Sequence, residues 1–311
     1  MPVKVAVIGL GHMGRIHLGK ICSFDGVHVE GIVDTDRSCG EECAQQYRLP
    51  VFTDYLEVIA GSDCAVISTP TESHYTIAKD CLERGLHVFI EKPITATVDE
   101  GRELVEIARS RDLVLQVGHL ERLNPALVEA MPHIRKPVFV ETRRISPFTG
   151  RSTDIDVVLD LMIHDLDLVL SIVGQDVEHI AAQGICFVSD QYDFVNARLQ
   201  FAGGCGASLT ASRISDHRER SITIYEDHAS YHVDLMQGKL ATVRRIASLQ
   251  TETLEFTASR MDPVREELLQ FIQSVEGRGT PSVTGLDGLK ALELANRIRN
   301  HIAGKQNATD G

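Results

Sequence analysis

The sequence predicts an α/β protein with two domains, a doubly wound parallel sheet at the N-terminus and an α+β domain with a mainly antiparallel, open sheet behind it. Three observations support this fold class. β-branched runs alternate with helical stretches up to about residue 120, a glycine-rich segment follows the first run, and short alternating runs fill the second half. A length of 311 residues also suits two cores. We place the domains at 1–120 and 121–311.

The first domain is expected to alternate strands and helices along its whole length. Apolar, β-branched runs predict buried parallel strands at 3–8, 27–33, 64–68, 86–90 and 114–117. Helices are predicted between them, through about residue 22 and at 36–47, 74–84 and 97–111. Alternation at this spacing is typical of a doubly wound parallel sheet.

A Gly-x-Gly-x-x-Gly motif lies between the first strand and the first helix. Its first glycine allows a tight turn, the second lets a pyrophosphate approach the backbone, and the third permits close packing of helix on strand. Free N–H groups at the helix N-terminus then face the phosphates. We therefore expect a Rossmann domain that binds a nicotinamide dinucleotide. The residues predicted to bind it here are Gly9, Leu10, Gly11, His12, Met13 and Gly14.

The residue at the end of the second strand is expected to determine the selectivity between NAD and NADP. Asp34 follows Gly14 by 20 residues, a spacing at which a carboxylate can accept the ribose hydroxyls. A carboxylate there repels a 2′-phosphate, so the sequence favours NAD. Arg37 leaves NADP open, because its guanidinium could accommodate that phosphate or could be a solvated residue at the start of a helix.

The composition narrows the classes of partner. The formal net charge is −13, which repels nucleic acid and acidic membrane surfaces at long range. No apolar run approaches the roughly 20 residues that span a bilayer, and the N-terminus lacks the regions of a signal peptide. The seven cysteines form no Cys-x-x-Cys pair, which predicts reduced packing thiols. We expect a cytoplasmic protein with no nucleic-acid, membrane or metal partner.

Three further motifs follow one another along the chain. They are Ser68-Thr-Pro-Thr-Glu-Ser-His74, Glu91-Lys-Pro93 and Gln116-Val-Gly-His-Leu-Glu-Arg-Leu-Asn-Pro125. This ordered set resembles the glucose–fructose oxidoreductase, inositol dehydrogenase and rhizopine catabolism (Gfo/Idh/MocA) family of sugar dehydrogenases. The resemblance extends over most of the chain, and Glu-Lys-Pro directly after a strand is its most specific part.

The resemblance implies roles for the residues of these motifs. Thr69 and Pro70 would line the nicotinamide-ribose side of the cofactor site. Glu91 and Lys92 would bind the cofactor, with the lysine also catalytic at the junction of cofactor and substrate. The chemistry suits a lysine, because an ammonium beside the reacting carbinol stabilises negative charge on its oxygen as hydride leaves carbon.

A largely apolar segment at the start of the second domain predicts a helix with two polar residues on one face. Asp160 and His164 are four residues apart on it. The family carries Asp-x-x-x-His here, which implies that His164 is the acid–base residue and that Asp160 holds substrate and histidine in place. An imidazole suits this role because its unperturbed pKa of about 6.5 is close to working pH. The alternative is a pair without function on this helix. The apolar residues around it would then bury its charge, which costs free energy.

The rest of the second domain predicts a sheet covered on one face by that helix. Strands are expected at 137–146, 176–188, 192–201, 205–213, 219–226, 229–234 and 239–246, and helices at 264–276 and 286–303. Its other face needs a partner or a polar surface. Members of the resembled family often pair such sheets, which implies a homodimer or homotetramer through the C-terminal sheet.

Arginines gather around the catalytic segments of this acidic chain. Guanidinium groups bind phosphate oxygens in a forked geometry, so such a cluster favours a diphosphate ligand. The alternative is that the arginines pair with acids such as Glu141 and Glu219. The residues predicted to bind the substrate are Arg122, Arg144, Arg151 and Arg213, with Arg218 and Arg220 in the same gathering.

The segment from Arg143 to Arg151 is similar to a subgroup of the family, the UDP-N-acetylglucosamine 3-dehydrogenases. We therefore favour hydride transfer between nicotinamide and a sugar or nucleotide-sugar carbinol, with the C3 hydroxyl of a UDP-N-acetylhexosamine as the substrate group. Two alternatives stay open. A free polyol or sugar dehydrogenase of the inositol or glucose type needs no phosphate-binding arginine, and a dinucleotide-binding regulatory protein needs no turnover.

Overall fold

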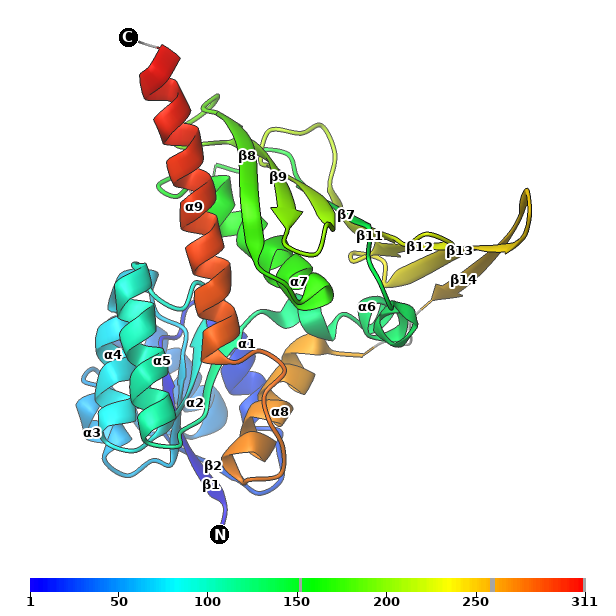
Figure 1. The fold of residues 1–311 in the computed structure, drawn as a ribbon. Coiled ribbons are helices and arrows are strands. Elements are labelled where there is room, and N and C mark those ends of the chain that lie inside the picture. The colour runs from blue at the N-terminus through cyan, green and yellow to red at the C-terminus, as the bar shows by residue number, and fades with distance from the viewer. Residues whose placement is uncertain (151–152, 258–260, 310–311) are drawn as a thin grey trace. The chain divides into compact units, whose positions relative to one another are not determined.

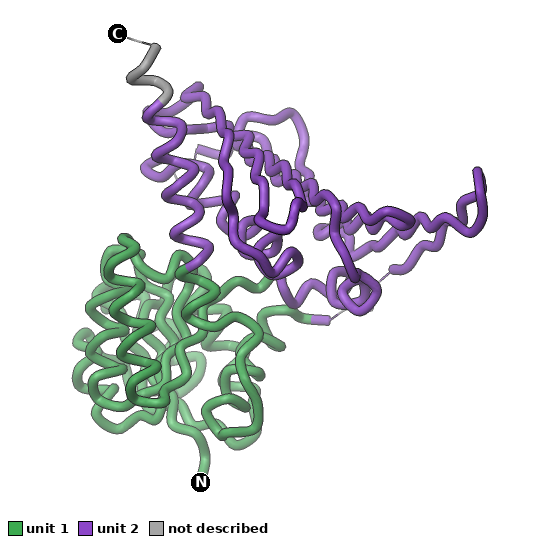
Figure 2. The backbone as a smooth tube through the Cα atoms, viewed as in Figure 1, with its two compact units in different colours: residues 1–120, 262–289 green, residues 121–261, 290–311 purple. Residues whose placement is uncertain are grey.

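The computed structural model describes residues 1–150, 153–257 and 261–309. The chain forms two compact units, 1–120 with 262–289 and 121–261 with 290–311 (Figure 2). The boundary after residue 120 falls where the sequence-based division places it. That division leaves 262–289 with the second domain, whereas the structure packs this segment into the first unit.

The first unit is built on a six-stranded parallel sheet with helices on both faces (Figure 1). The strand order is β3-β2-β1-β4-β5-β6, with β1 (Val3–Ile8), β2 (Val27–Val33), β3 (Val51–Phe52), β4 (Cys64–Ile67), β5 (His87–Glu91) and β6 (Leu115–Gly118). The order reverses between β1 and β4. Sheets of this kind bind ligands beyond the carboxyl ends of the strands at such a point. The predicted Rossmann domain is confirmed.

Some helices of this unit begin at side-chain caps. Thr97 and Glu100 form a capping box, and the side chain of Asp262 accepts the backbone N–H of Arg265. The helices are α1 (His12–Ile21), α2 (Arg37–Tyr47), α3 (Leu56–Ile59), α4 (Thr71–Glu83), α5 (Val98–Ser110) and α8 (Pro263–Val275).

Helix α8 explains why 262–289 belongs to the first unit. Its buried Leu268 and Phe271 lie in the same apolar cluster as Leu18 of α1. The rings of Phe89 and Phe271 also meet edge to face, with centroids 5.9 Å apart. Periodicity predicts an amphipathic helix here, but it does not say which surface that helix covers.

The second unit is built on an eight-stranded, mainly antiparallel sheet, as predicted. Its order is β14-β13-β12-β11-β7-β10-β9-β8. The strands are β7 (Phe139–Ile145), β8 (Val177–Ile185), β9 (Phe194–Phe201), β10 (Gly206–Ser212), β11 (Glu219–Tyr225), β12 (Ala229–Asp234), β13 (Lys239–Ala247) and β14 (Gln250–Thr257). Among the described strand pairs of this sheet, only β7 and β10 run parallel.

Helices pack on one face of this second sheet. They are α6 (Pro125–Ala130), α7 (Ile163–Val173) and the part of α9 (Gly285–Thr309) that follows residue 289. Strand β9 shows how the faces differ, because Val195, Ala197 and Leu199 are buried in the core whereas Asn196 is half-buried and Arg198 exposed on the other side. On β9 the second face is therefore polar and open.

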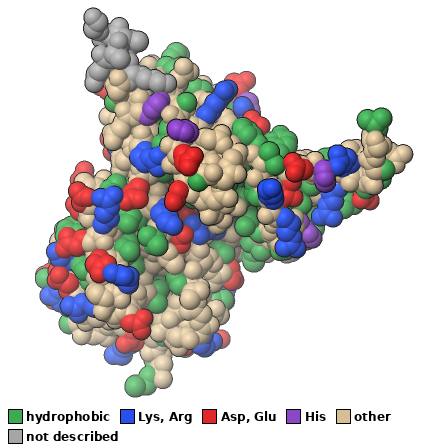
Figure 3. All heavy atoms as spheres, viewed as in Figure 1, with side chains coloured by type: hydrophobic (Ala, Val, Ile, Leu, Met, Phe, Trp, Pro, Cys, Tyr) green, Lys and Arg blue, Asp and Glu red, His purple; other side chains and the backbone are tan. Residues whose placement is uncertain are grey.

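Acidic and basic side chains are interspersed over the first unit on the face shown in Figure 3. That face of the unit offers no continuous positive surface. No helix within residues 1–150, 153–257 and 261–309 is long and apolar enough to cross a membrane. The same stretches of chain contain no group of three or more His, Cys, Asp or Glu side chains that could hold a metal ion.

Candidate functional site

The glycine-rich loop at the end of β1 has the shape that a dinucleotide requires. Gly9 has φ +90°, and a Cβ there would lie 2.7 Å from the backbone of Ser68. A Cβ on Gly14 would lie 1.9 Å from the carbonyl oxygen of Gly9. A Cβ on Gly11 would meet nothing within 4 Å. The first and third glycines thus serve close packing, and the second leaves open space at the N-terminus of α1, which fits a pyrophosphate.

The different surroundings of these glycines predict different effects of alanine. Gly11→Ala is expected to change the free energy of unfolding by less than about 0.5 kcal/mol, yet to raise the Kd for NAD at least about tenfold, because the methyl group occupies the pyrophosphate space. Gly14→Ala is expected to destabilise the protein by about 1–3 kcal/mol, because its methyl group overlaps Gly9. Urea unfolding and calorimetric titration with NAD measure both. Wild-type affinity in Gly11→Ala would contradict this placement of the pyrophosphate.

Asp34 is held at the carboxyl end of β2 beside that loop. The backbone N–H of Leu10 donates to Oδ2 of Asp34 at 2.7 Å, and that of Asp36 donates to Oδ1 at 2.9 Å. A carboxylate accepts more than two hydrogen bonds, so ribose hydroxyls can still bind it. Arg37 pairs with Glu41 at 3.0 Å on the solvent side of α2, with its side chain 77% exposed. This geometry fits NAD and gives Arg37 a surface ion pair.

The Glu-Lys-Pro motif lies at the end of β5. Nε2 of His17, on α1, donates to Oε1 of Glu91 at 2.7 Å. Lys92 is half-buried, and its peptide bond to Pro93 is cis. His17 is fully buried. No motif in the sequence marks a lone histidine on a buried helix face as the hydrogen-bond partner of Glu91. Sequence analysis therefore did not predict His17.

His74, on α4, joins the two loops that the resemblance places around the nicotinamide. Its Nδ1 lies 2.9 Å from the carbonyl oxygen of Pro93, and its Nε2 lies 2.9 Å from that of Thr69. Burial lowers the pKa of His74, whereas its bonds to these carbonyl groups raise it. The loops after β4 and β5 are thus tied to each other, and Thr69, Pro70, Glu91 and Lys92 come together at neighbouring strand ends.

In the second unit Asp160 lies on a π-helical turn, Val158–Met162, that leads directly into α7. Asp156 fixes the start of this turn. One of its carboxylate oxygens accepts the backbone N–H groups of Val158 and Leu159, and the other accepts Nε of Arg299 at 2.6 Å. Such π turns occur frequently at functional sites. His164 follows as the second residue of α7.

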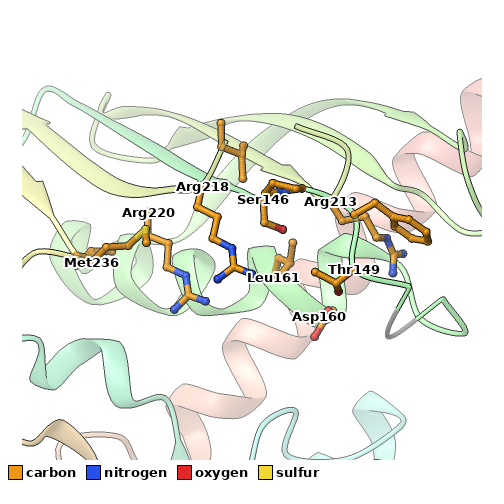
Figure 4. A pocket seen from close by; sticks show the side chains of 12 residues that line it. Ser146, Thr149, Asp160, Leu161, Arg213, Arg218, Arg220 and Met236 are labelled. Carbon is orange, nitrogen blue, oxygen red and sulfur yellow. The ribbon is translucent and has the colours of Figure 1, made fainter. Parts of the chain in front are cut away.

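A cavity of about 500 Å³ opens beside Asp160 (Figure 4). It combines an acidic group, several basic groups and an apolar wall, which suits a ligand that is polar on one side. Its lining comes from the end of β7, the π turn, the β10–β11 connection and the segment after β12. The lining residues are Ile145, Ser146, Pro147, Phe148, Thr149, Asp160, Leu161, Arg213, Arg218, Arg220, Leu235 and Met236.

The arginines predicted to bind substrate lie in different surroundings. Arg122 makes two hydrogen bonds to Asp167, at 2.8 and 2.6 Å. Arg213 lines the cavity and pairs with Asp193 at 3.0 Å. Arg151 lies outside the described residues. The substrate contacts of all these residues stay predictions.

Arg144 is enclosed by carboxylates. It is 3% exposed and bonds Asp165 at 2.7 and 3.0 Å and Glu121 at 2.8 Å. Burial raises the pKa of Asp165 even with this guanidinium beside it. The substrate role expected for Arg144 also stays a prediction, and in the structure its guanidinium joins the two acids.

Two family models match the chain. One, described as an oxidoreductase family with an NAD-binding Rossmann fold, matches residues 3–119. The other, the GFO/IDH/MocA C-terminal domain, matches 139–246. The first match lies within the first unit and the second within the second unit.

Several known proteins are similar over nearly the full chain. The UDP-N-acetylglucosamine 3-dehydrogenase of Acidithiobacillus ferrooxidans is 30% identical over 96% of each chain. Its solved structure superposes with a TM-score of 0.92 over 97% of this chain and 98% of that one. The scyllo-inositol 2-dehydrogenase (NAD(+)) of Bacillus subtilis is 26% identical over 96% of this chain and 94% of its own. A levoglucosan dehydrogenase solved with NADH and levoglucosan, 17% identical, shares the fold with a TM-score of 0.90 over 98% of each chain.

Proposed function

Because this chain belongs to the Gfo/Idh/MocA family of NAD-binding oxidoreductases, we propose that it oxidises the C3 hydroxyl of a UDP-N-acetylhexosamine to a ketone. The observation that carries the proposal is the cavity of the second unit, where Asp160 shares the lining with arginines. A neutral polyol offers those arginines hydroxyl acceptors but no negative charge. The 30% identity to a UDP-N-acetylglucosamine 3-dehydrogenase over 96% of each chain supports the same substrate.

In the proposed mechanism three side chains handle charge and proton. The glycine loop and Asp34 would hold NAD, which would supply the hydride acceptor for C3. Lys92 stabilises negative charge on the C3 oxygen, and His164 takes the hydroxyl proton as general base. Asp160 holds the substrate and the imidazole in the reactive orientation. Oxidation of one hydroxyl thus gives one ketone, one NADH and one proton.

A second candidate is oxidation of a free polyol. The 26% identity to a scyllo-inositol 2-dehydrogenase favours it, because the same lysine, aspartate and histidine would serve an uncharged ring. The alternative of a dinucleotide-binding regulatory protein has no such support, because the similar proteins are named dehydrogenases in an oxidoreductase family.

Absorbance at the NADH band distinguishes these candidates. Purified protein with NAD is mixed in parallel with UDP-N-acetylglucosamine, other UDP-sugars, N-acetylglucosamine, glucose and inositols. We expect NADH with UDP-N-acetylglucosamine and none with free sugars or inositols. NADH from inositol or glucose alone would replace the proposal by the polyol candidate. No signal from any compound, with NAD still bound, would overturn both.

We further propose that the protein works in the cytoplasm as a homodimer or homotetramer paired through the open face of the second sheet. The outward residues of β9 and β10, such as Asn196, Ser208 and Thr210, are small or polar and half-buried, which suits a second sheet packed about 10 Å away. The seven free cysteines suit a reducing compartment. Light scattering on the eluting protein measures the molar mass, and a monomer at micromolar concentration would contradict the pairing.

A further inference from the structure

Two arginines line one wall of the cavity. Arg218 lies in the connection between β10 and β11, and Arg220 is the second residue of β11. Figure 4 shows both side chains extending in the same direction into the cavity, with Asp160 on its other side. Two guanidinium groups therefore face the space in which the proposed substrate would bind.

The positive charges of this pair are only partly offset by nearby acids. Arg218 makes no hydrogen bond or ion pair with any residue that the structure describes. The carboxylate nearest to Arg220 in an ion pair is Glu121, at 3.9 Å, and this carboxylate already accepts a hydrogen bond from Arg144 at 2.8 Å. Arg144 itself, by contrast, is held by two acids.

Charges of both signs act on Arg220. Burial and the positive charges of Arg144 and Arg218 lower its pKa, whereas the carboxylates of Glu121 and Asp165 oppose this shift without reversing it. A guanidinium stays protonated at neutral pH all the same, because its ordinary pKa is far above 7. Two adjacent positive charges in a partly enclosed cavity repel each other, and an anion bound between them removes that repulsion.

We propose that Arg218 and Arg220 form a diphosphate subsite in this cavity. The choice of a nucleotide diphosphate rests on the proposed function, whereas the prediction of an anion rests on the two guanidinium groups that face the cavity. Each guanidinium offers a planar fork of donors, so two of them match the oxygens of two linked phosphates.

The rest of the lining fits the neighbouring parts of such a ligand. The hydroxyl groups of Ser146 and Thr149 line the same cavity and can donate to phosphate or sugar oxygens. Leu235 and Met236 supply an apolar surface for a flat base. A diphosphate held in this cavity, away from the reacting carbon, would help to position that carbon for hydride transfer.

Calorimetric titration of the NAD-loaded protein with UDP, inorganic pyrophosphate and uridine tests the subsite. We expect UDP and pyrophosphate to bind and uridine to bind at least about tenfold more weakly than UDP. Arg218→Ala and Arg220→Ala should each weaken UDP binding about 10- to 100-fold, the range for a hydrogen bond between charged groups. Arg218→Lys should lose less, because it keeps the charge without the fork.

The matched control is Arg109→Ala, which removes an exposed arginine of α5 that pairs with Glu106 in the first unit. It should bind UDP as the wild type does, and circular dichroism confirms that every variant is folded. Equal affinity for UDP and uridine, or wild-type UDP affinity in both cavity variants, would overturn the subsite. If UDP binding depends on the arginines but UDP-N-acetylglucosamine yields no NADH, the proposed function fails and the subsite stands.

Discussion

A His164→Ala variant is expected to lose about 10²- to 10⁴-fold in kcat, the range that a positioned general base contributes. It should still bind NAD with the wild-type Kd, because the glycine loop and Asp34 belong to the other unit. Stopped-flow absorbance at the NADH band and titration with NAD measure the two effects. Added imidazole should restore part of the rate, which a purely structural role of His164 would not allow.

Two further variants make this result specific. His179→Ala removes a histidine of β8 in the same unit, away from the cavity beside Asp160, and should keep wild-type kcat. Lys92→Ala should lose about 10²- to 10³-fold in kcat, because the charge that stabilises the developing alkoxide is gone. Wild-type turnover in His164→Ala or Lys92→Ala would remove the proposed mechanism.

The first unit was predictable because its signals are local. Strand, glycine loop and helix follow one another within a few residues, and Asp34 directly follows the next strand, so the sequence alone predicts the residues of the proposed dinucleotide site. The parts that sequence analysis missed depend on distant contacts. Helix α8 packs against α1 although more than two hundred residues separate them, and His17 reaches Glu91 from another element.

Strand β14 shows a different limit. Every residue from Gln250 to Thr257 is exposed, so the strand has no buried face. Period-two alternation is confined to Thr253-Leu-Glu-Phe-Thr257 and follows a run of polar residues, so it gives only a weak strand signal. The π turn at Asp160 is hidden for another reason, because the same apolar spacing suits an α-helix and a π turn.

The acidic partners of the arginines could not be predicted from the sequence. Sequence analysis finds that they gather but not which acids they meet, because Asp165 and Asp167 come from α7 whereas Arg122 and Arg144 come from other elements. The structure divides them into guanidinium groups held by carboxylates and the pair that faces the cavity. This division depends on tertiary contacts that no spacing in the sequence encodes.

Arg144→Met is expected to destabilise the protein by about 3–5 kcal/mol, because it leaves the buried Asp165 without its hydrogen-bonded counter-charge and leaves Glu121 only the more distant Arg220. Asp165 is 2% exposed and Glu121 is 6% exposed, so water cannot replace the guanidinium. For a unit of this size the loss corresponds to a fall in Tm of roughly 6–20 °C. Arg143→Ala, one residue earlier in β7, removes an exposed pair with Glu219 and should cost less than about 1 kcal/mol.

Lower pH should reduce the difference in the free energy of unfolding between Arg144→Met and the wild type. Burial already raises the pKa of Asp165, and Arg144 is the charge that opposes this shift most strongly. Without Arg144 the pKa in the folded state rises further above that of the unfolded chain, so the folded variant gains protons, and stability, as the pH falls. Thermal unfolding at pH 7.5 and pH 5 should therefore show a smaller difference at pH 5. Combining Arg144→Met with Glu121→Gln and Asp165→Asn should recover most of the loss, because no buried charge is left unpaired. A pH-independent deficit, or no recovery in the triple variant, would show that lost packing around Arg144 rather than unpaired charge destabilises the protein.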